Sequence, residues 1–300
     1  MANDTMFSGS RLTPWHGLGT VIEGRANAQQ ALQLAKLDWE VENRPVYTAD
    51  MTEIPGYRAL TRTDSGEALG IVWKTYTALQ NRTLAEIAET VVSTGEAAFE
   101  TGGSLFNGRL IWFLLKIGER QLSNGELHKN YLLASNGHAG KARVRFGLVN
   151  TRVVCWNTFS AATSESGAAF AVSHTKNLMP RIEAGMKVMK WAHEGTEALF
   201  RSYEMLLDKA MSVDAANRLL REHILAERAS DATVDGILDL YREGNGNSGK
   251  TAFDLFNGIT DWLDHREVGD VKAAERRMEK SVMGEDAKLK RHAMEVLMHA

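Results

Sequence analysis

The stretch Tyr131–Ser160 has the sequence YLLASNGHAGKARVRFGLVNTRVVCWNTFS and contains the strongest secondary-structure signals in the chain. Its first four residues form an apolar run that is typical of a buried strand. Ser135–Gly140 follows with the sequence SNGHAG, and its Asn-Gly pair predicts a turn because both residues tolerate positive φ. From Lys141 to Val149 apolar and polar residues alternate, which predicts a second strand. The stretch therefore predicts a β-hairpin.

The second strand of this hairpin is expected to have one apolar and one cationic face. The apolar face holds Ala142, Val144, Phe146 and Leu148, and the other face holds Lys141, Arg143, Arg145 and Gly147. A row of cations suits a chain of phosphates, but the solvated face of an antiparallel sheet also needs polar residues, so both interpretations stay open here. Beyond the strand, Thr151 is expected to cap a helix that runs towards Ala162.

The distribution of charge favours the first interpretation. Between Gly103 and Ser164 the chain has eight cations and two acids, a net charge of +6. The other residues have 27 cations and 36 acids, a net charge of −9, so the total of −3 hides a basic middle in an acidic chain. Such a local excess of positive charge is typical of a surface that binds a polyanion.

The first half of the chain predicts an antiparallel sheet with two or three packed helices. Asn107-Gly108 and Asn124-Gly125 are hairpin signals, and Pro55-Gly56 is expected to form a further turn. The expected helices are Asn27–Leu37, capped by Asn27, and Asn81–Thr94. The expected strands before the decisive hairpin are Trp39–Asp50, Tyr57–Thr63, Ala68–Tyr76 and Arg109–Gly118.

The second half predicts helices almost throughout, from Pro180 to His299. Ser212 and Asp231 are expected to cap helices, and Val271–Met298 is expected to form one final helix that could dock a neighbouring subunit. The fold class is therefore α+β, with an antiparallel sheet and packed helices followed by a helical part. The expected division is residues 1–175, the sheet region with the basic hairpin, and residues 176–300, the helical region.

Composition excludes several classes of protein. The longest apolar runs are strand-sized, so no membrane span is expected, and the N-terminus lacks the pattern of a signal peptide. A single cysteine, Cys155, excludes an internal disulfide and fits a reducing compartment, which predicts a cytoplasmic protein. One cysteine also excludes a thiolate-rich zinc site, and neither a metal nor a cofactor is expected.

Two motifs suggest chemistry that their surroundings do not support. GNGNSGKT at Gly244–Thr251 matches the phosphate-binding loop pattern, but a helical segment precedes it where that mechanism requires a buried strand. Cys155 with His138 or His174 could supply a nucleophile and a base. The apolar, helix-like VVCWN sequence around Cys155 instead suggests a buried cysteine that acts as a small hydrophobe.

Several segments resemble the phage/plasmid-like protein family, which is domain of unknown function 932. They are PWHGLG near the start, ETGGSLFNGRLIW, YLLASNGHAGKARVRF, RVVCWNTF, HTKN and GNSGKTAFDLFNGITDWLDH. The resemblance spans about Pro14–His265 and implies a phage or mobile-element origin, without an established activity. The expected architecture is also similar to that of phage single-strand DNA annealing proteins, which assemble into multimers with a basic groove.

These observations predict a non-catalytic DNA-binding protein that holds single-stranded DNA by its backbone, forms homo-oligomers and anneals strands in recombination. An enzyme that uses Cys155 with a nearby histidine, or Lys250 with a nucleotide, is one alternative, and a factor that binds a host protein is another. Trp15 could stack bases or anchor its loop. The expected nucleic-acid-binding residues are Arg109, Lys141, Arg143, Arg145, Arg152, Trp156 and Lys176.

Overall fold

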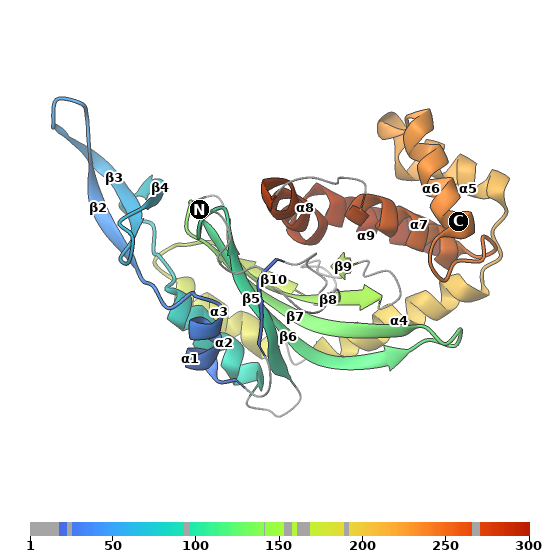
Figure 1. The fold of residues 1–300 in the computed structure, drawn as a ribbon, viewed down its shortest axis with the longest axis horizontal. Helices are drawn as coiled ribbons and strands as arrows, with labels where there is room; N and C mark the ends of the chain where they lie inside the picture. Colours follow the sequence, from blue (N-terminus) through green and yellow to red (C-terminus); the bar gives the residue numbers. More distant parts are fainter. Residues whose placement is uncertain are drawn as a thin grey trace.

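The architecture is described from a computed structural model of the chain. The structure describes residues 18–22, 26–92, 97–140, 142–152, 158–160, 169–188, 192–265 and 271–300. Its fold is α+β, as the sequence predicts, with antiparallel sheets in the first half and helices in the second (Figure 1).

The main sheet has seven described strands, all paired antiparallel. Its strand order is β1-β5-β6-β7-β8-β10, and β9 pairs with β8 beside that path. The strands are β1 (Thr20–Val21), β5 (Ala98–Leu105), β6 (Leu110–Gln121), β7 (Leu127–Gly137), β8 (Val144–Arg152), β9 (Thr158–Ser160) and β10 (Ala169–Val172). The predicted hairpins at Asn107-Gly108 and Asn124-Gly125 are the β5–β6 and β6–β7 connections.

The decisive hairpin is confirmed as β7 and β8, with two corrections. Strand β7 continues through Gly137 and β8 begins at Val144 rather than at Lys141, so the connection lies later in the chain than Ser135–Gly140. Thr151 does not cap a helix, because it lies in β8 opposite Lys129 and β9 follows at Thr158–Ser160. Ladder pairing on both sides of β8 outweighs the capping preference of an isolated threonine.

Side chains on the two faces of the main sheet enter different cores, because successive residues of a strand point to opposite sides. Val144 and Phe146 share a core with Phe113 and with residues of the helices α1 (Ala28–Leu34), α2 (Asn81–Val92) and α3 (Leu178–Val188). Val149 packs on the other face with Trp112 and with Met278 and Val282 of α8 (Val271–Met283). The face expected to be purely cationic is therefore partly covered.

A second sheet, which we call the arm, consists of β2 (Val41–Tyr47), β3 (Glu53–Arg62) and β4 (Ala68–Trp73). It projects from one end of the main sheet (Figure 1). The expected turn at Pro55-Gly56 is wrong, since both residues lie within β3 and the chain reverses between β2 and β3. Pro55 is accommodated because it lies in the register shift between the pairs Pro45–Arg58 and Tyr47–Glu53, where no partner requires its missing N–H.

The helical part also includes α4 (Ala192–Asp208), α5 (Val213–Leu219), α6 (Asp231–Glu243), α7 (Ala252–His265) and α9 (Glu285–His299). A π-helical turn (Leu220–Ile224) and a 3-10 turn (Ala226–Arg228) separate α5 from α6. Ser212 caps α5 as predicted, but Ser230 rather than Asp231 caps α6. Two helices, α8 and α9, replace the single expected helix Val271–Met298 and meet at Gly284, because glycine weakens a helix interior.

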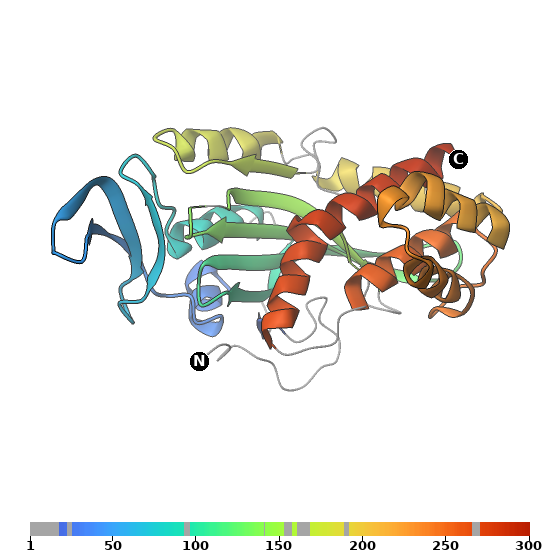
Figure 2. The ribbon, with the colours of Figure 1, turned by 90° about the horizontal axis from the view of Figure 1, so that it is seen from above.

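Helices α5–α7 lie towards the end of the main sheet opposite the arm, in both ribbon views (Figure 1; Figure 2). The division at residues 175 and 176 stays a prediction, although Leu178 and Ile182 of α3 pack in the core of the sheet. Among the described residues, none of the helices has both the length and the apolarity needed to cross a bilayer.

Candidate nucleic-acid interface

The candidate interface lies at the arm end of the main sheet, which we define by the paired residues Leu110 and Gly137 and by Val144 and Val172. The far end is defined by Gln121, opposite Leu127, and by Arg152, opposite His128. Because β6 and β8 start at the arm end, while β7 and β10 finish there, four strands deliver their flanking residues to it.

Three of the predicted cations lie at this arm end. Arg109 immediately precedes β6, Arg143 precedes β8, and Lys176 follows β10 by four residues. All three side chains are exposed, and none has an ion-pair partner among the described residues. Unneutralised cations gathered at one edge keep their full attraction for an anion.

The other predicted residues are not all brought to this place. Arg152 ends β8 at the far end, about 30 Å along a nine-residue strand from Arg143, at the usual rise of a strand. Lys141 and Trp156 lie outside the described residues, as do Cys155 and Trp15. The described part of the predicted set therefore separates into an arm-end group and one residue at the far end.

An arginine cluster connects the arm end to the last helix. Arg145 is on β8 two residues after Arg143, and Arg291 is on α9. Burial and then the positive charge of Arg143 lower the pKa of Arg145. Burial and then the positive charge of Arg145 lower the pKa of Arg291, although Glu295 acts in the opposite direction. The three like charges therefore lie near one another, and an anion bound between them would relieve their repulsion.

Arg291 was missed by the sequence reasoning. It lies in α9, whose sequence EDAKLKRHAMEVLMH is rich in both signs of charge, so no single cation stands out. Only the packing of α9 over the sheet brings it near β8. The sequence would place Arg291 near β8 only if the break of Val271–Met298 into two helices were already known.

Three cations of the basic segment that lie away from the arm end are paired with acids. Lys116 is 2.5 Å from Glu119, which Lys129 also approaches at 4.0 Å, and Arg120 is 2.6 Å from Glu197 of α4. The hydrogen bond from Lys116, ahead of its charge, lowers the pKa of Glu119. These three cations belong to the basic segment of the sequence, but their positive charge is already neutralised locally.

His138 is fully buried beneath the arm end. Its Nε2 atom lies 2.8 Å from Oδ1 of Asn81 and its Nδ1 atom has no hydrogen-bond partner among the described residues. Burial, and then the charges of His174 and Arg62, lower the pKa of His138 to about 3. The imidazole is therefore neutral at pH 7 and enclosed, which suits a structural role better than that of a base for Cys155.

His174 is also buried, with its Nδ1 atom 3.0 Å from the carbonyl oxygen of Thr77 and its ring stacked on Tyr76 at 4.5 Å. Burial lowers its pKa in spite of that hydrogen bond. The two histidines proposed as alternatives for catalysis thus hold the connection between the arm and the sheet. Tyr76 completes this connection by donating to the carbonyl oxygen of Gly137 at 2.9 Å.

The GNGNSGKT segment joins two helices, α6 and α7, as its flanking sequence predicts. The carboxylate of Asp254 accepts hydrogen bonds from the backbone amides of Lys250 and Thr251 and from the hydroxyl of Ser248. Burial alone would raise the pKa of Asp254, but these donors outweigh it and lower that pKa. The groups that would hold a phosphate are therefore occupied by the protein's own anion.

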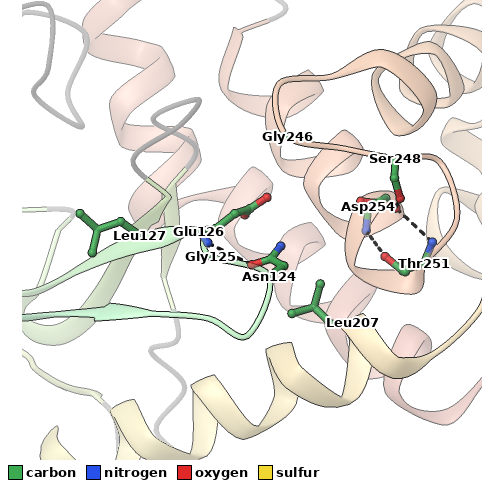
Figure 3. A pocket seen from close by; sticks show the side chains of 9 residues that line it. All are labelled: Asn124, Gly125, Glu126, Leu127, Leu207, Gly246, Ser248, Thr251 and Asp254. Carbon is green, nitrogen blue, oxygen red and sulfur yellow. Dashed lines mark hydrogen bonds between the residues drawn. The ribbon is translucent and has the colours of Figure 1, made fainter.

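A pocket of about 570 Å³ opens beside this segment (Figure 3). It lies between the β6–β7 turn, Leu207 of α4 and the loop before α7. Glu126 and Asp254 are its charged lining residues, and no cation is among the residues that line it. A site with this charge repels phosphate, so the structure gives no support to a nucleotide at Lys250.

No group of three or more metal-binding side chains occurs among the described residues. No curated protein and no solved structure matches the chain. The family model described as "Domain of unknown function (DUF932)" matches residues 68–293, which include the arginine cluster, the buried histidines and the GNGNSGKT segment. The chain therefore belongs to the DUF932 family.

Proposed function

We propose that this protein binds single-stranded DNA by its phosphates at the arm end of the main sheet. Arg143, Arg145 and Arg291 would hold the phosphate chain, and Arg109 and Lys176 would extend the contact along the strand ends. The observation that carries the proposal is that three exposed cations, Arg109, Arg143 and Lys176, gather at this end without a described acidic partner, while Lys116, Arg120 and Lys129 are paired elsewhere.

Backbone-directed binding explains why the cations come from several elements rather than from one motif. Phosphates repeat along a strand and carry no sequence information, so a broad cationic surface is sufficient. The role we propose is non-catalytic, since His138 is neutral and buried beneath the interface rather than exposed on it. Annealing of complementary strands during recombination of a phage or plasmid, in the cytoplasm of the host, is the process that such a surface would serve.

The test is fluorescence anisotropy of a labelled oligo-dT at low and moderate salt. The wild-type protein should bind at low salt and weaken as salt rises, because binding releases counterions. Arg143→Glu should weaken binding about tenfold and reduce the salt dependence by roughly one phosphate contact or more. Arg201→Glu on α4 is the matched control, since Arg201 is exposed and has no described ion-pair partner.

Two outcomes contradict the proposal. One is an absence of binding to single and double strands at low salt. The other is an equal effect of Arg143→Glu and Arg201→Glu, which would mean that only the total charge matters. Thermal unfolding of each variant shows whether the fold is retained.

Annealing requires several copies of the protein to organise one strand, so we also propose a homo-oligomer. Light scattering after size exclusion, with and without oligo-dT, should show a molar mass several times 33.2 kDa in the presence of DNA. A monomer under both conditions would leave DNA binding possible but contradict annealing by a multimeric assembly.

A further inference from the structure

The arm carries an unusual concentration of exposed apolar side chains. Among the described large apolar residues that are exposed, four lie in the arm, and they are Tyr47, Met51, Ile71 and Trp73. Trp73 is 61% exposed and Ile71 is 60% exposed, on the same strand. A set of exposed apolar residues on one small sheet indicates a surface that another molecule covers.

Trp73 and Tyr57 form a stacked pair on the outer face of the arm. They are directly opposite in the pairing of β3 and β4, and their rings lie 4.4 Å apart at an angle of 27°. A Cβ atom at Gly56 would lie 3.3 Å from the Trp73 ring, so glycine leaves room for the indole to lie over β3. Tyr57 thus supports one side of the indole, while most of the Trp73 side chain stays accessible.

The opposite face of the arm attaches this pair to the cationic end of the main sheet. Leu60 and Val72 are buried there, and a Cβ atom at Gly140 would lie 2.9 Å from Val72. At Gly70, a Cβ atom would lie 2.8 Å from the backbone of Ala139. Residues 139 and 140 belong to the connection that leads into Arg143, so the arm is attached beside the cationic end of the main sheet.

Charge on the arm is mostly neutralised within it. Glu42 pairs with Arg44, Glu53 with Arg58 and Asp64 with Arg62. Lys74 directly follows Trp73, is exposed, and has no ion-pair partner among the described residues. The neighbourhood of Trp73 therefore offers an aromatic surface with one available cation, which is the combination that attracts a nucleobase and its phosphate.

We propose that Trp73, supported by Tyr57, is a stacking platform for a base of the same single strand whose phosphates the arginines hold. This inference rests on the proposed function. The inference also extends the proposed function, because a duplex hides the faces of its bases and only an unpaired base can stack on the indole. The platform, rather than the cations, would thus set the preference for single strands.

The test compares two probes of equal length and charge, a labelled oligo-dT and a labelled oligomer of abasic phosphodiester units. The wild-type protein should bind oligo-dT about tenfold more tightly than the abasic chain, since each stacked base adds affinity. Trp73→Ala should reduce that ratio towards one, and Trp73→Phe should retain most of it. Met205→Ala is the control, because Met205 is an exposed apolar residue on α4 outside the arm.

The possible failures are distinguishable. If neither probe binds at low salt, the proposed function fails and the platform with it. If both probes bind and Trp73→Ala leaves their ratio unchanged, the platform is wrong while phosphate binding stands. If Trp73→Ala lowers the molar mass measured by light scattering and leaves the ratio unchanged, this face is an interface between copies, which also overturns the inference.

Discussion

The arm end and the far end of the main sheet are built from the same strands but differ in the polar groups that they leave exposed. At the far end, His128, Asn130 and Asn150 are buried and hydrogen-bonded to one another, and Tyr203 of α4 joins them. At the arm end, the exposed Arg109 and Arg143 have no described ion-pair partner. The proposal of binding at the arm end rests on this difference.

Helix α4 covers the far end but not the arm end, and this explains much of the difference. Helix α4 packs against the far end, so each polar group there must find a partner within the protein or pay the cost of desolvation. The exposed cations of the arm end remain in water and need no partner to be stable. A ligand that brings its own negative charges can therefore replace water at the arm end without disturbing the fold.

The largest expected effect is at the far end. Asn150→Leu removes the acceptor for His128 Nδ1 at 2.8 Å and for the Tyr203 hydroxyl at 3.2 Å, and the donor to Asn130 at 2.8 Å. We expect a loss of about 3 kcal/mol in the free energy of unfolding, because buried polar groups lose their partners. Denaturant unfolding measures it.

The control for that change is Asn43→Ala, at an exposed position of β2, which should alter the free energy of unfolding by less than about 0.5 kcal/mol. Equal effects of the two substitutions would mean that the far-end network contributes nothing special to stability. The comparison between the two ends would then lose its basis.

The next effect concerns pH and the buried histidine beneath the arm end. The pKa of His138 is about 3 in the folded state against an ordinary value of 6.5, so the unfolded chain binds the extra proton first. Stability from this group is complete above pH 6.5 and is lost as pH falls towards 3. Between pH 6.5 and 4.5 the loss should be about 2 kcal/mol.

Denaturant unfolding at several pH values tests this dependence. His138→Gln should flatten the fall in stability below pH 6.5 relative to the wild-type protein. His299→Gln, at an exposed position in α9, should leave the dependence as it is. If His138→Gln and wild type lose stability in parallel, protonation of His138 is not what limits stability in acid.

The smallest effect is expected for the paired cations near the far end. Lys116→Ala breaks an ion pair with Glu119 in which both side chains are about a third exposed. Solvent screens such pairs, so the free energy of unfolding should change by less than about 0.5 kcal/mol. Oligo-dT affinity should not change either. A large loss of affinity for Lys116→Ala would show that the nucleic-acid surface is not restricted to the arm end.

Much of the fold could be predicted because local patterns agree with it. The turns at Asn107-Gly108 and Asn124-Gly125 and the helical second half reappear in the structure, whereas Asn136-Gly137 lies within β7 rather than in a turn. The errors arose where tertiary pairing outweighs local preference. Thr151 lies in a strand paired on both sides, and Pro55-Gly56 lies within a strand rather than at its end.

The candidate interface was only partly predictable, for the same physical reason. Arg109 and Arg143 flank strands whose turns are encoded locally, so their neighbourhood follows from the hairpins. Arg143 immediately precedes β8 and Arg152 is its last residue, so the two lie at opposite ends of one strand. A count of cations along the sequence cannot separate these two ends. The stacked Tyr57 and Trp73 pair depends on the register of β3 and β4, which no short motif specifies.

The α+β class, the central hairpin and the concentration of positive charge in the middle of the chain follow from local properties, namely periodicity, turn residues and charge. Long-range packing sets which cations have acidic partners, brings Arg291 of α9 towards β8 and leaves Trp73 of the arm exposed to solvent. Those features depend on contacts between residues that are far apart in sequence, and packing of the whole chain sets them.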